Sequence, residues 1–134
     1  MDADQITLVQ ESWKKITSMP AIAEMFYGRL FELDPAIKPL FKGDMVEQGR
    51  KLIDMLNIAV SDLTDLERLV PEIQELGRRH RDYGVTPDHY GVVGAALLWT
   101  LEKELGNAFT PSVRAAWAET YYLLAETMKA GTQD

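Results

Sequence analysis

The sequence predicts a single all-α domain that spans residues 1–134 and contains six to eight helices. Apolar residues recur at helical spacing along most of the chain, and no segment shows the sustained apolar–polar alternation that is typical of a strand. Helix-start signals, in which a cap residue precedes a proline, occur at Thr86-Pro87 and Thr110-Pro111. A chain of 134 residues is long enough to bury one sizeable core.

Composition excludes several classes of protein. The formal net charge of −7 argues against nucleic acids and anionic membranes as partners. Because the chain has no cysteine, disulfides, iron–sulfur clusters and thiolate zinc sites are excluded, and only histidine and oxygen ligands remain for a metal. No stretch approaches about 18 uninterrupted apolar residues, and the N-terminus carries no basic region followed by an apolar one. We therefore expect a folded cytoplasmic protein without a membrane anchor.

The first two predicted helices are separated by a proline. Asp4 is the expected N-cap of the first, which Met19-Pro20 closes and whose apolar stripe contains Ile6, Val9, Trp13 and Ile16. The second starts at Pro20, and one of its sides carries Ala23, Phe26, Tyr27, Leu30 and Phe31. Tyr27 is the polar member of that side. Residues 34–43, with two prolines and a glycine, predict a turn or short helical corner that contains Leu40 and Phe41.

A third helix is expected from about Asp44 to Asp62. Gln48 shares its apolar side with Leu52, Met55, Leu56 and Ala59. Gly49 costs helix propensity of about 1 kcal/mol against alanine, and a common reason to accept that cost is close approach of another helix. Residues 61–65 form a link to the next helix.

The helix predicted over residues 66–80 places His80 on its apolar stripe. A buried imidazole must find a hydrogen-bond partner or a metal, because burying it unpaired costs roughly 1–3 kcal/mol. A structural core histidine and a metal ligand both fit this helix taken alone. The helix ends near Tyr83-Gly84, where glycine can adopt a left-handed cap conformation.

Two more helices complete the chain. Thr86-Pro87-Asp88 opens one that carries Tyr90, Val93 and Gly94 and ends at Gly106-Asn107. Thr110-Pro111 opens the last, whose stripe contains Val113, Trp117, Tyr121, Leu124 and Met128.

The sequence lacks the usual signatures of hydrolytic enzymes. His89 is the only other histidine, no HExxH spacing exists, and neither a phosphate-binding glycine loop nor a GxSxG elbow is present. What remains is one polar group on an apolar face of each of three helices, namely Tyr27, Gln48 and His80. One imidazole with an opposing phenol and amide in apolar surroundings is what a haem iron needs to hold a small gas.

At this point a family resemblance becomes specific. The chain resembles the bacterial single-domain globins related to flavohaemoglobins, the Vitreoscilla-type group. The residues that carry the resemblance extend from Trp13 to Met128 and include Leu30-Phe31, Pro35, Phe41, Gln48-Gly49-Arg50-Lys51-Leu52, Leu76-Gly77-Arg78-Arg79-His80, Tyr83-Gly84-Val85, Tyr90, Val93-Gly94, Trp117 and Tyr121. Their order and spacing together are far more specific than any one motif.

The resemblance implies a globin fold around a pocket for haem b, iron protoporphyrin IX. It makes His80 the axial metal ligand and turns Tyr27 and Gln48 toward the gas. The pocket would be lined by Phe41, Leu52, Met55, Leu76, Val85, Tyr90 and Val93. Lys51 and Arg79 are candidates for the haem propionates, and solvated surface charge is the equally good alternative.

The chain departs from that family on the proximal side. Flavohaemoglobins place a glutamate near the end of the last helix, against the second nitrogen of the axial histidine. The corresponding Lys129-Ala130-Gly131-Thr132 has no carboxylate. We therefore expect the other nitrogen of His80 to bond a backbone carbonyl of its own helix.

The resemblance leaves two functions open. The chain would bind, store or deliver O₂ with high affinity, because the Tyr27 hydroxyl, supported by Gln48, can donate a hydrogen bond to the partly negative gas ligand. Alternatively, it would convert NO to nitrate with a separate electron donor or reductase. CO is a further expected ligand, and we expect a monomer or weak homodimer. A cofactor-free helical interaction module is the remote alternative.

Overall fold

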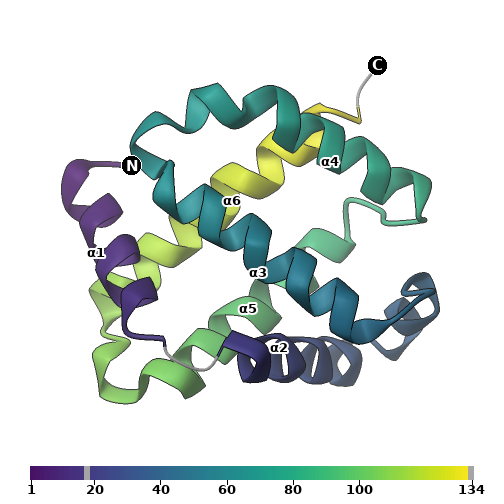
Figure 1. The fold of residues 1–134 in the computed structure, drawn as a ribbon, viewed down its shortest axis with the longest axis horizontal. Helices are drawn as coiled ribbons and strands as arrows, with labels where there is room; N and C mark the ends of the chain where they lie inside the picture. Colours follow the sequence, from purple (N-terminus) through teal and green to yellow (C-terminus); the bar gives the residue numbers. More distant parts are fainter. Residues whose placement is uncertain (17–18, 133–134) are drawn as a thin grey trace.

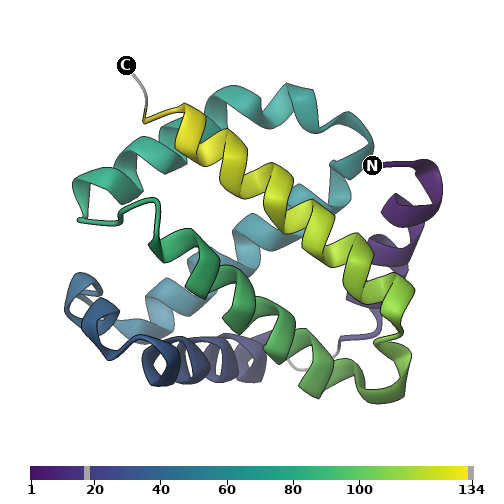
Figure 2. The same cartoon turned by 180° about the vertical axis from the view of Figure 1, so that it is seen from behind.

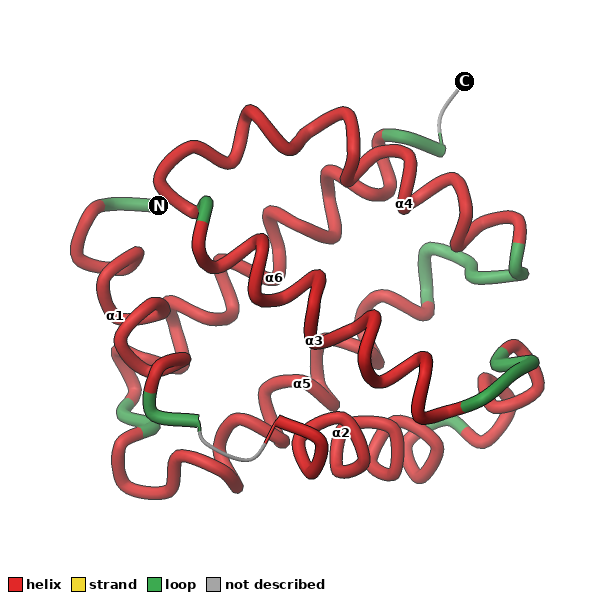
Figure 3. Tube along the Cα trace, in the orientation of Figure 1, coloured by secondary structure: helices red, strands yellow, loops and turns green. Residues whose placement is uncertain are grey.

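The computed structural model describes residues 1–16 and 19–132, and the described part is helical without a strand. Its six α-helices and three 3₁₀ helices are α1 (Ala3–Lys14), α2 (Met19–Leu33), η1 (Pro35–Leu40), α3 (Met45–Ser61), η2 (Leu63–Leu69), α4 (Val70–Asp82), α5 (His89–Leu105), η3 (Gly106–Ala108) and α6 (Pro111–Ala130). Figure 3 shows how little of the trace lies outside helices. The prediction of an all-α fold is confirmed.

The helices pack in two layers. α3 lies on one face of the molecule and α5 and α6 lie on the other, as Figures 1 and 2 show from opposite sides. α2 packs on α5 and α3, whereas α4 packs on α6. Because Tyr27, Gln48 and His80 lie on α2, α3 and α4, this arrangement decides how the three polar groups are placed.

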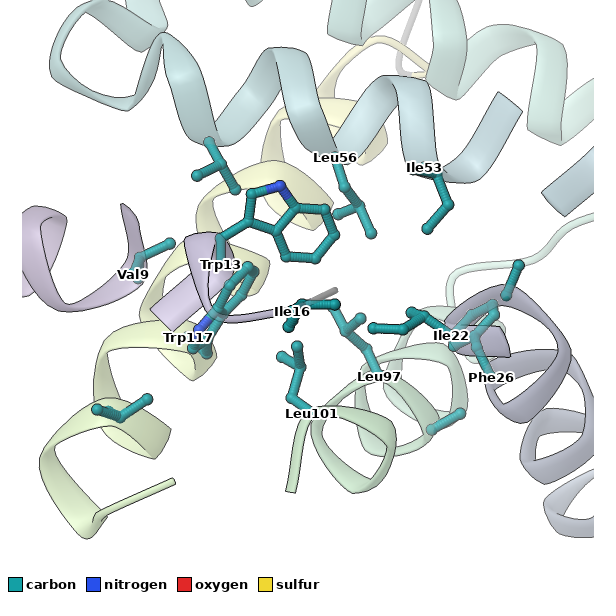
Figure 4. Close-up of a cluster of buried hydrophobic side chains, with 14 of the residues drawn as sticks. Val9, Trp13, Ile16, Ile22, Phe26, Ile53, Leu56, Leu97, Leu101 and Trp117 are labelled. Atoms are coloured by element: carbon teal, nitrogen blue, oxygen red, sulfur yellow. The ribbon is translucent and has the colours of Figure 1, made fainter. Parts of the chain in front are cut away.

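The main core is built around two tryptophans, whose ring centroids lie 5.7 Å apart (Figure 4). The indole N–H of Trp117 donates to Ser12 Oγ at 2.9 Å, and that of Trp13 donates to Asn57 Oδ1 at 2.7 Å. Both indole N–H groups therefore have hydrogen-bond partners, and Trp13, which lies on the predicted apolar stripe, is a core residue.

The N-terminal helix differs from its prediction at both ends. Asp2, not Asp4, caps α1, because its carboxylate accepts the Gln5 N–H at 2.8 Å while the Gln5 side chain accepts the Asp2 N–H at 3.4 Å. The helix ends at Lys14 rather than at Met19-Pro20. Residues 17–18, between α1 and α2, lie outside the described residues.

The helix predicted over residues 66–80 is two elements. Its first residues, up to Leu69, belong to the 3₁₀ helix η2, and α4 starts only at Val70; Asp65, just before the predicted range, has non-helical backbone angles, φ −139° and ψ 54°. Pro71 lies in the first turn of α4, where its missing N–H costs nothing, so its ring favours a new helix start there. Apolar periodicity alone could not show where η2 ends and α4 begins, because the apolar spacing continues from one helix into the next.

The helix predicted to open at Thr86-Pro87-Asp88 starts at His89 instead. The Thr86 backbone N–H donates to His89 Nδ1 at 3.0 Å. The predicted side-chain cap is absent, because the N-cap residue is Asp88, whose side chain makes no capping hydrogen bond to the described backbone. Thr110 does cap its helix, since its hydroxyl oxygen accepts the Val113 N–H at 3.2 Å.

Glycines allow helices to cross closely around the three polar groups. An added Cβ on Gly49 of α3 would lie 2.9 Å from the Ala23 Cβ of α2, which confirms the expected close approach. An added Cβ on Gly77 of α4 would overlap the Met128 backbone carbonyl of α6. α4, which carries His80, is thus positioned by backbone contact with α6.

We expect Gly77→Ala to destabilise the fold. Alanine favours a helix by about 1 kcal/mol over glycine, but the new methyl group would push α4 from α6, and overpacking costs typically about 1–3 kcal/mol. Gly28→Ala is the matched control, because nothing lies within 4 Å of an added Cβ there, so it should be neutral or stabilising. Urea unfolding of both variants measures the difference, and equal stability would contradict the tight crossing.

Candidate functional site

His80 lies in the last turn of α4, and its ring is half-buried. His80 Nδ1 lies 2.8 Å from the Leu76 carbonyl oxygen, which can only accept, so Nδ1 carries the proton and donates. This confirms the expected bond to a carbonyl of the same helix. No hydrogen bond to His80 Nε2 occurs within the described residues, and its lone pair is therefore available to a metal.

The electrostatic surroundings of His80 favour the neutral ring. Burial lowers the pKa of His80, the Leu76 carbonyl opposes that effect, and the charge of Arg79 adds to it. At the end of α6, where the flavohaemoglobin glutamate would lie, Arg78 donates to the Gly131 carbonyl at 3.1 Å and Arg81 donates to the Thr132 carbonyl at 3.0 Å. The neutral imidazole is the form that ligates metals.

The opposing polar groups come together where α2 meets α3. The Tyr27 hydroxyl donates to the Gln48 backbone carbonyl oxygen at 3.3 Å, a long distance for an O–H···O bond. Phe41, just after η1, packs edge-on to Tyr27 with ring centroids 5.3 Å apart and to Phe31 at 5.4 Å. The structure thus brings Tyr27, Gln48 and Phe41 to one place.

The predicted lining residues bridge two groups of buried side chains. Leu52, Met55 and Val93 are half-buried against the main core. A second group, which we call the α4–α6 core, contains Tyr90 and Met128, and Leu76, Val85 and also Met55 pack against it. Half-buried apolar side chains from α3, α4 and α5 therefore leave apolar surface available, which fits a flat apolar group. Lys51 and Arg79 are both exposed.

Tyr121 is a structural residue beside the site whose contact sequence reasoning did not find. Its hydroxyl donates to the Tyr90 carbonyl oxygen at 2.6 Å, and its ring lies where a Cβ on Gly94 would be. This bond ties α6 to the first turn of α5 and holds Tyr90. The signal in the sequence is the same as for Tyr27, a tyrosine on an apolar helical stripe.

A half-open pocket of about 490 Å³ lies between α2 and α3. Of the residues predicted for the site, only Tyr27 lines it; the rest of its wall includes Phe31, Gly49 and Ile53. The only indication of this pocket in the sequence was Gly49, which predicted that another helix approaches closely.

Burial raises the pKa of Tyr27 to about 12, so the phenol stays protonated and remains a donor. Unfolded tyrosine ionises near pH 10, so the stability linked to Tyr27 is complete below about pH 10 and is lost as the pH rises toward 12. That loss should amount to roughly 2–3 kcal/mol. Tyr27→Phe should lose less stability than the unsubstituted chain between pH 9 and 11.5 in urea unfolding, and equal losses would show that Tyr27 ionises freely in the fold.

Comparison with known proteins decides the family. The family model described as Globin matches residues 24–128. The chain belongs to the globin family. This globin is similar to neuroglobin of Danio rerio, with 34% identity over 92% of this chain and 87% of the relative. It is also similar to the neuroglobins of Tetraodon nigroviridis and Chaenocephalus aceratus, each with 32% identity over the same shares of the two chains.

Family membership confirms the globin fold and the function predicted from the sequence. The protein is a haem-binding globin with oxygen binding as its function, and the interaction-module alternative is not favoured. These relatives are vertebrate proteins, so they do not support the bacterial lineage that the sequence motifs suggested. In the described part of the chain, no helix is long and apolar enough to span a membrane.

Proposed function

We propose that this globin holds haem b through His80 Nε2 and binds O₂ with high affinity. The observation that carries the proposal is the 2.8 Å bond from His80 Nδ1 to the Leu76 carbonyl, because it selects the tautomer whose Nε2 lone pair can ligate iron. When bound, haem iron supplies reversible coordination of a diatomic gas.

On the distal side, Tyr27 would donate a hydrogen bond to the gas ligand. Its 3.3 Å bond to the Gln48 carbonyl is long and therefore weak, so turning the O–H toward a partly negative ligand costs little. The raised pKa of Tyr27 keeps that proton on the phenol at physiological pH. The Gln48 side-chain amide makes no hydrogen bond within the described residues and can provide the second polar contact.

The half-buried apolar side chains would hold the porphyrin. Phe41, Leu52 and Val93, which pack against the main core, and Leu76 and Val85, which pack against the α4–α6 core, offer the apolar surface that a porphyrin ring requires. The exposed cations Lys51 and Arg79 would pair with the propionates.

The remaining expectations stay predictions. Nitric oxide dioxygenation would use the same residues with a separate reductase, and no contact in the described residues favours it over O₂ binding. A bacterial lineage, a cytoplasmic location, CO binding and a monomer or weak homodimer are likewise predictions from the sequence.

Absorption spectra of the purified protein in air, after dithionite and after CO test the proposal. A Soret band that shifts on reduction and again with CO, with oxygenated bands that persist in air, is the expected result. No Soret band after haem is supplied would overturn haem binding. A Soret band with no persistent oxygenated form would overturn high O₂ affinity alone.

A further inference from the structure

α4 depends mainly on α6 for its place in the fold. Within the described residues, α4 packs closely on α6 and η2, whereas α2, α3 and α5 make at most minor contacts with it. Figures 1 and 2 show α4 lying across the C-terminal part of α6. Because His80 lies in the last turn of α4, the contacts that fix α4 on α6 also fix the His80 ring.

Two glycines set the distance between these helices. An added Cβ on Gly77 of α4 would overlap the Met128 carbonyl oxygen, and one on Gly131 at the end of α6 would overlap that of Gln74. Each helix thus meets the backbone of the other at a residue without a side chain. Because no side-chain ridge interlocks there, these contacts fix the separation of the helices but only weakly resist rotation of α4 about its axis.

Two arginines of α4 reach the end of α6. The Arg78 guanidinium donates to the Gly131 carbonyl oxygen at 3.1 Å, and Arg81 donates to the Thr132 carbonyl oxygen at 3.0 Å. The last carbonyls of a helix lack partners in their own helix and carry its partial negative charge, so cationic donors suit them. Arg78 also donates through Nε to Glu75 at 3.0 Å, which holds its side chain on α4.

The arginines lie where they can control rotation of α4. The residues of α4 that contact the end of α6 follow the i, i+3, i+4, i+7 spacing of one helical face: Gln74, Gly77, Arg78 and Arg81. His80 lies about 100° around the helix from Arg81, since an α-helix has about 3.6 residues per turn. Rotation of α4 would therefore swing the His80 ring sideways, and the two arginine bonds oppose that rotation.

We propose that Arg78 is a positioning residue for His80. It sets the rotation of α4 on α6, with Arg81 as the second contact, and thereby the direction in which His80 Nε2 points. Arg78 takes no part in ligation and acts through the backbone of α4, which also carries the Leu76 carbonyl that accepts the bond from His80 Nδ1. The inference rests on the proposed function, because Nε2 has an iron to meet only if haem binds.

Resonance Raman spectra of the reduced, gas-free, haem-loaded protein report the iron–histidine bond directly. Arg78→Met keeps an unbranched side chain but removes every donor, so we expect the iron–histidine band to broaden and to move to lower frequency. Haem transfer to a competing apoglobin should accelerate by about tenfold, the lower end of the usual effect of residues that orient a metal ligand. Arg114→Met is the matched control, since it removes the same charge from an exposed 3.9 Å pair with Glu102 and should change neither quantity.

Glu75→Met separates positioning from charge. It removes the carboxylate that holds the Arg78 side chain on α4, and it changes the local charge in the opposite direction to Arg78→Met. If Arg78 acts by position, Glu75→Met moves the iron–histidine band the same way as Arg78→Met, by a smaller amount. If only the charge matters, the two variants move the band in opposite directions, and the proposal is wrong.

Hydrogen exchange of the haem-free chain tests the same contact without haem. The amides of α4 near His80 should exchange faster in Arg78→Met than in Arg114→Met, and equal rates would contradict the inference. If Arg78→Met fails to fold, Arg81→Met carries the same expectations with smaller effects, because the bond that it removes is exposed.

Failure of this inference differs from failure of the proposed function. An unchanged iron–histidine band and an unchanged haem-transfer rate in Arg78→Met would overturn the role of Arg78 and leave haem binding by His80 intact. Absence of a Soret band in the unsubstituted chain would instead overturn the proposed function.

Discussion

Replacement of His80 by glycine is expected to abolish stoichiometric haem binding. His80 is the one described side chain that combines a half-buried imidazole, a proton fixed on Nδ1 and an unbonded Nε2. Without it, apolar contacts alone would hold the porphyrin, so the Soret band should broaden and disappear on gel filtration. The thermal stabilisation that haem gives to the native chain should disappear with it, because a ligand stabilises only the state that binds it.

Two comparisons separate ligation from general damage. His89→Ala is the matched control, because His89 is the other histidine and its Nδ1 bonds the Thr86 N–H at the start of α5. It should keep a normal Soret band. Free imidazole should restore haem binding to His80→Gly by filling the space of the lost ring. Full haem retention by His80→Gly without imidazole would contradict the assignment of His80 as ligand.

The helices could be predicted because their apolar faces are local patterns. The stripes that contain Tyr27, Gln48 and His80 each repeat within one segment, so the sequence placed all three on buried or half-buried faces. Helix ends were less predictable. Asp2 and Asp4 are both acceptable caps, and only the reciprocal contact with Gln5 decides between them. Pro71 could equally have kinked a longer helix, and only the structure shows that the residues up to Leu69 form a 3₁₀ helix and that α4 starts at Val70.

The sequence could predict which residues form the candidate site, but not the contacts that those residues make between helices. The bond from His80 to Leu76 is a contact four residues apart on one helix, so its geometry follows from helical periodicity. The bond from Tyr27 to the Gln48 carbonyl joins residues 21 positions apart and depends on how closely α2 and α3 cross. The pocket beside Tyr27 is the space left by that crossing, which no local pattern specifies.

Tyr27→Phe is expected to accelerate O₂ dissociation by about tenfold to a hundredfold. A charge-assisted hydrogen bond from the Tyr27 hydroxyl is worth about 1.5–3 kcal/mol, and each 1.36 kcal/mol corresponds to about a tenfold change in rate. The ring that packs against Phe41 stays in place, since only the hydroxyl is removed. Stopped-flow displacement of O₂ by CO measures the rate. CO takes up little negative charge, so its own dissociation should change much less than that of O₂.

Tyr121→Phe provides the matched control for this change. Tyr121 is half-buried like Tyr27, its pKa is raised by burial and by Tyr90, and its hydroxyl donates to a backbone carbonyl at 2.6 Å, as that of Tyr27 does at 3.3 Å. The Tyr121 hydroxyl bonds Tyr90 and not Gln48, so its loss should reduce stability by about 0.5–1.5 kcal/mol and leave the O₂ dissociation rate unchanged. Equal acceleration in both variants would mean that a loosened fold releases the gas. Acceleration in Tyr27→Phe alone would assign the retention of O₂ to the hydroxyl of Tyr27.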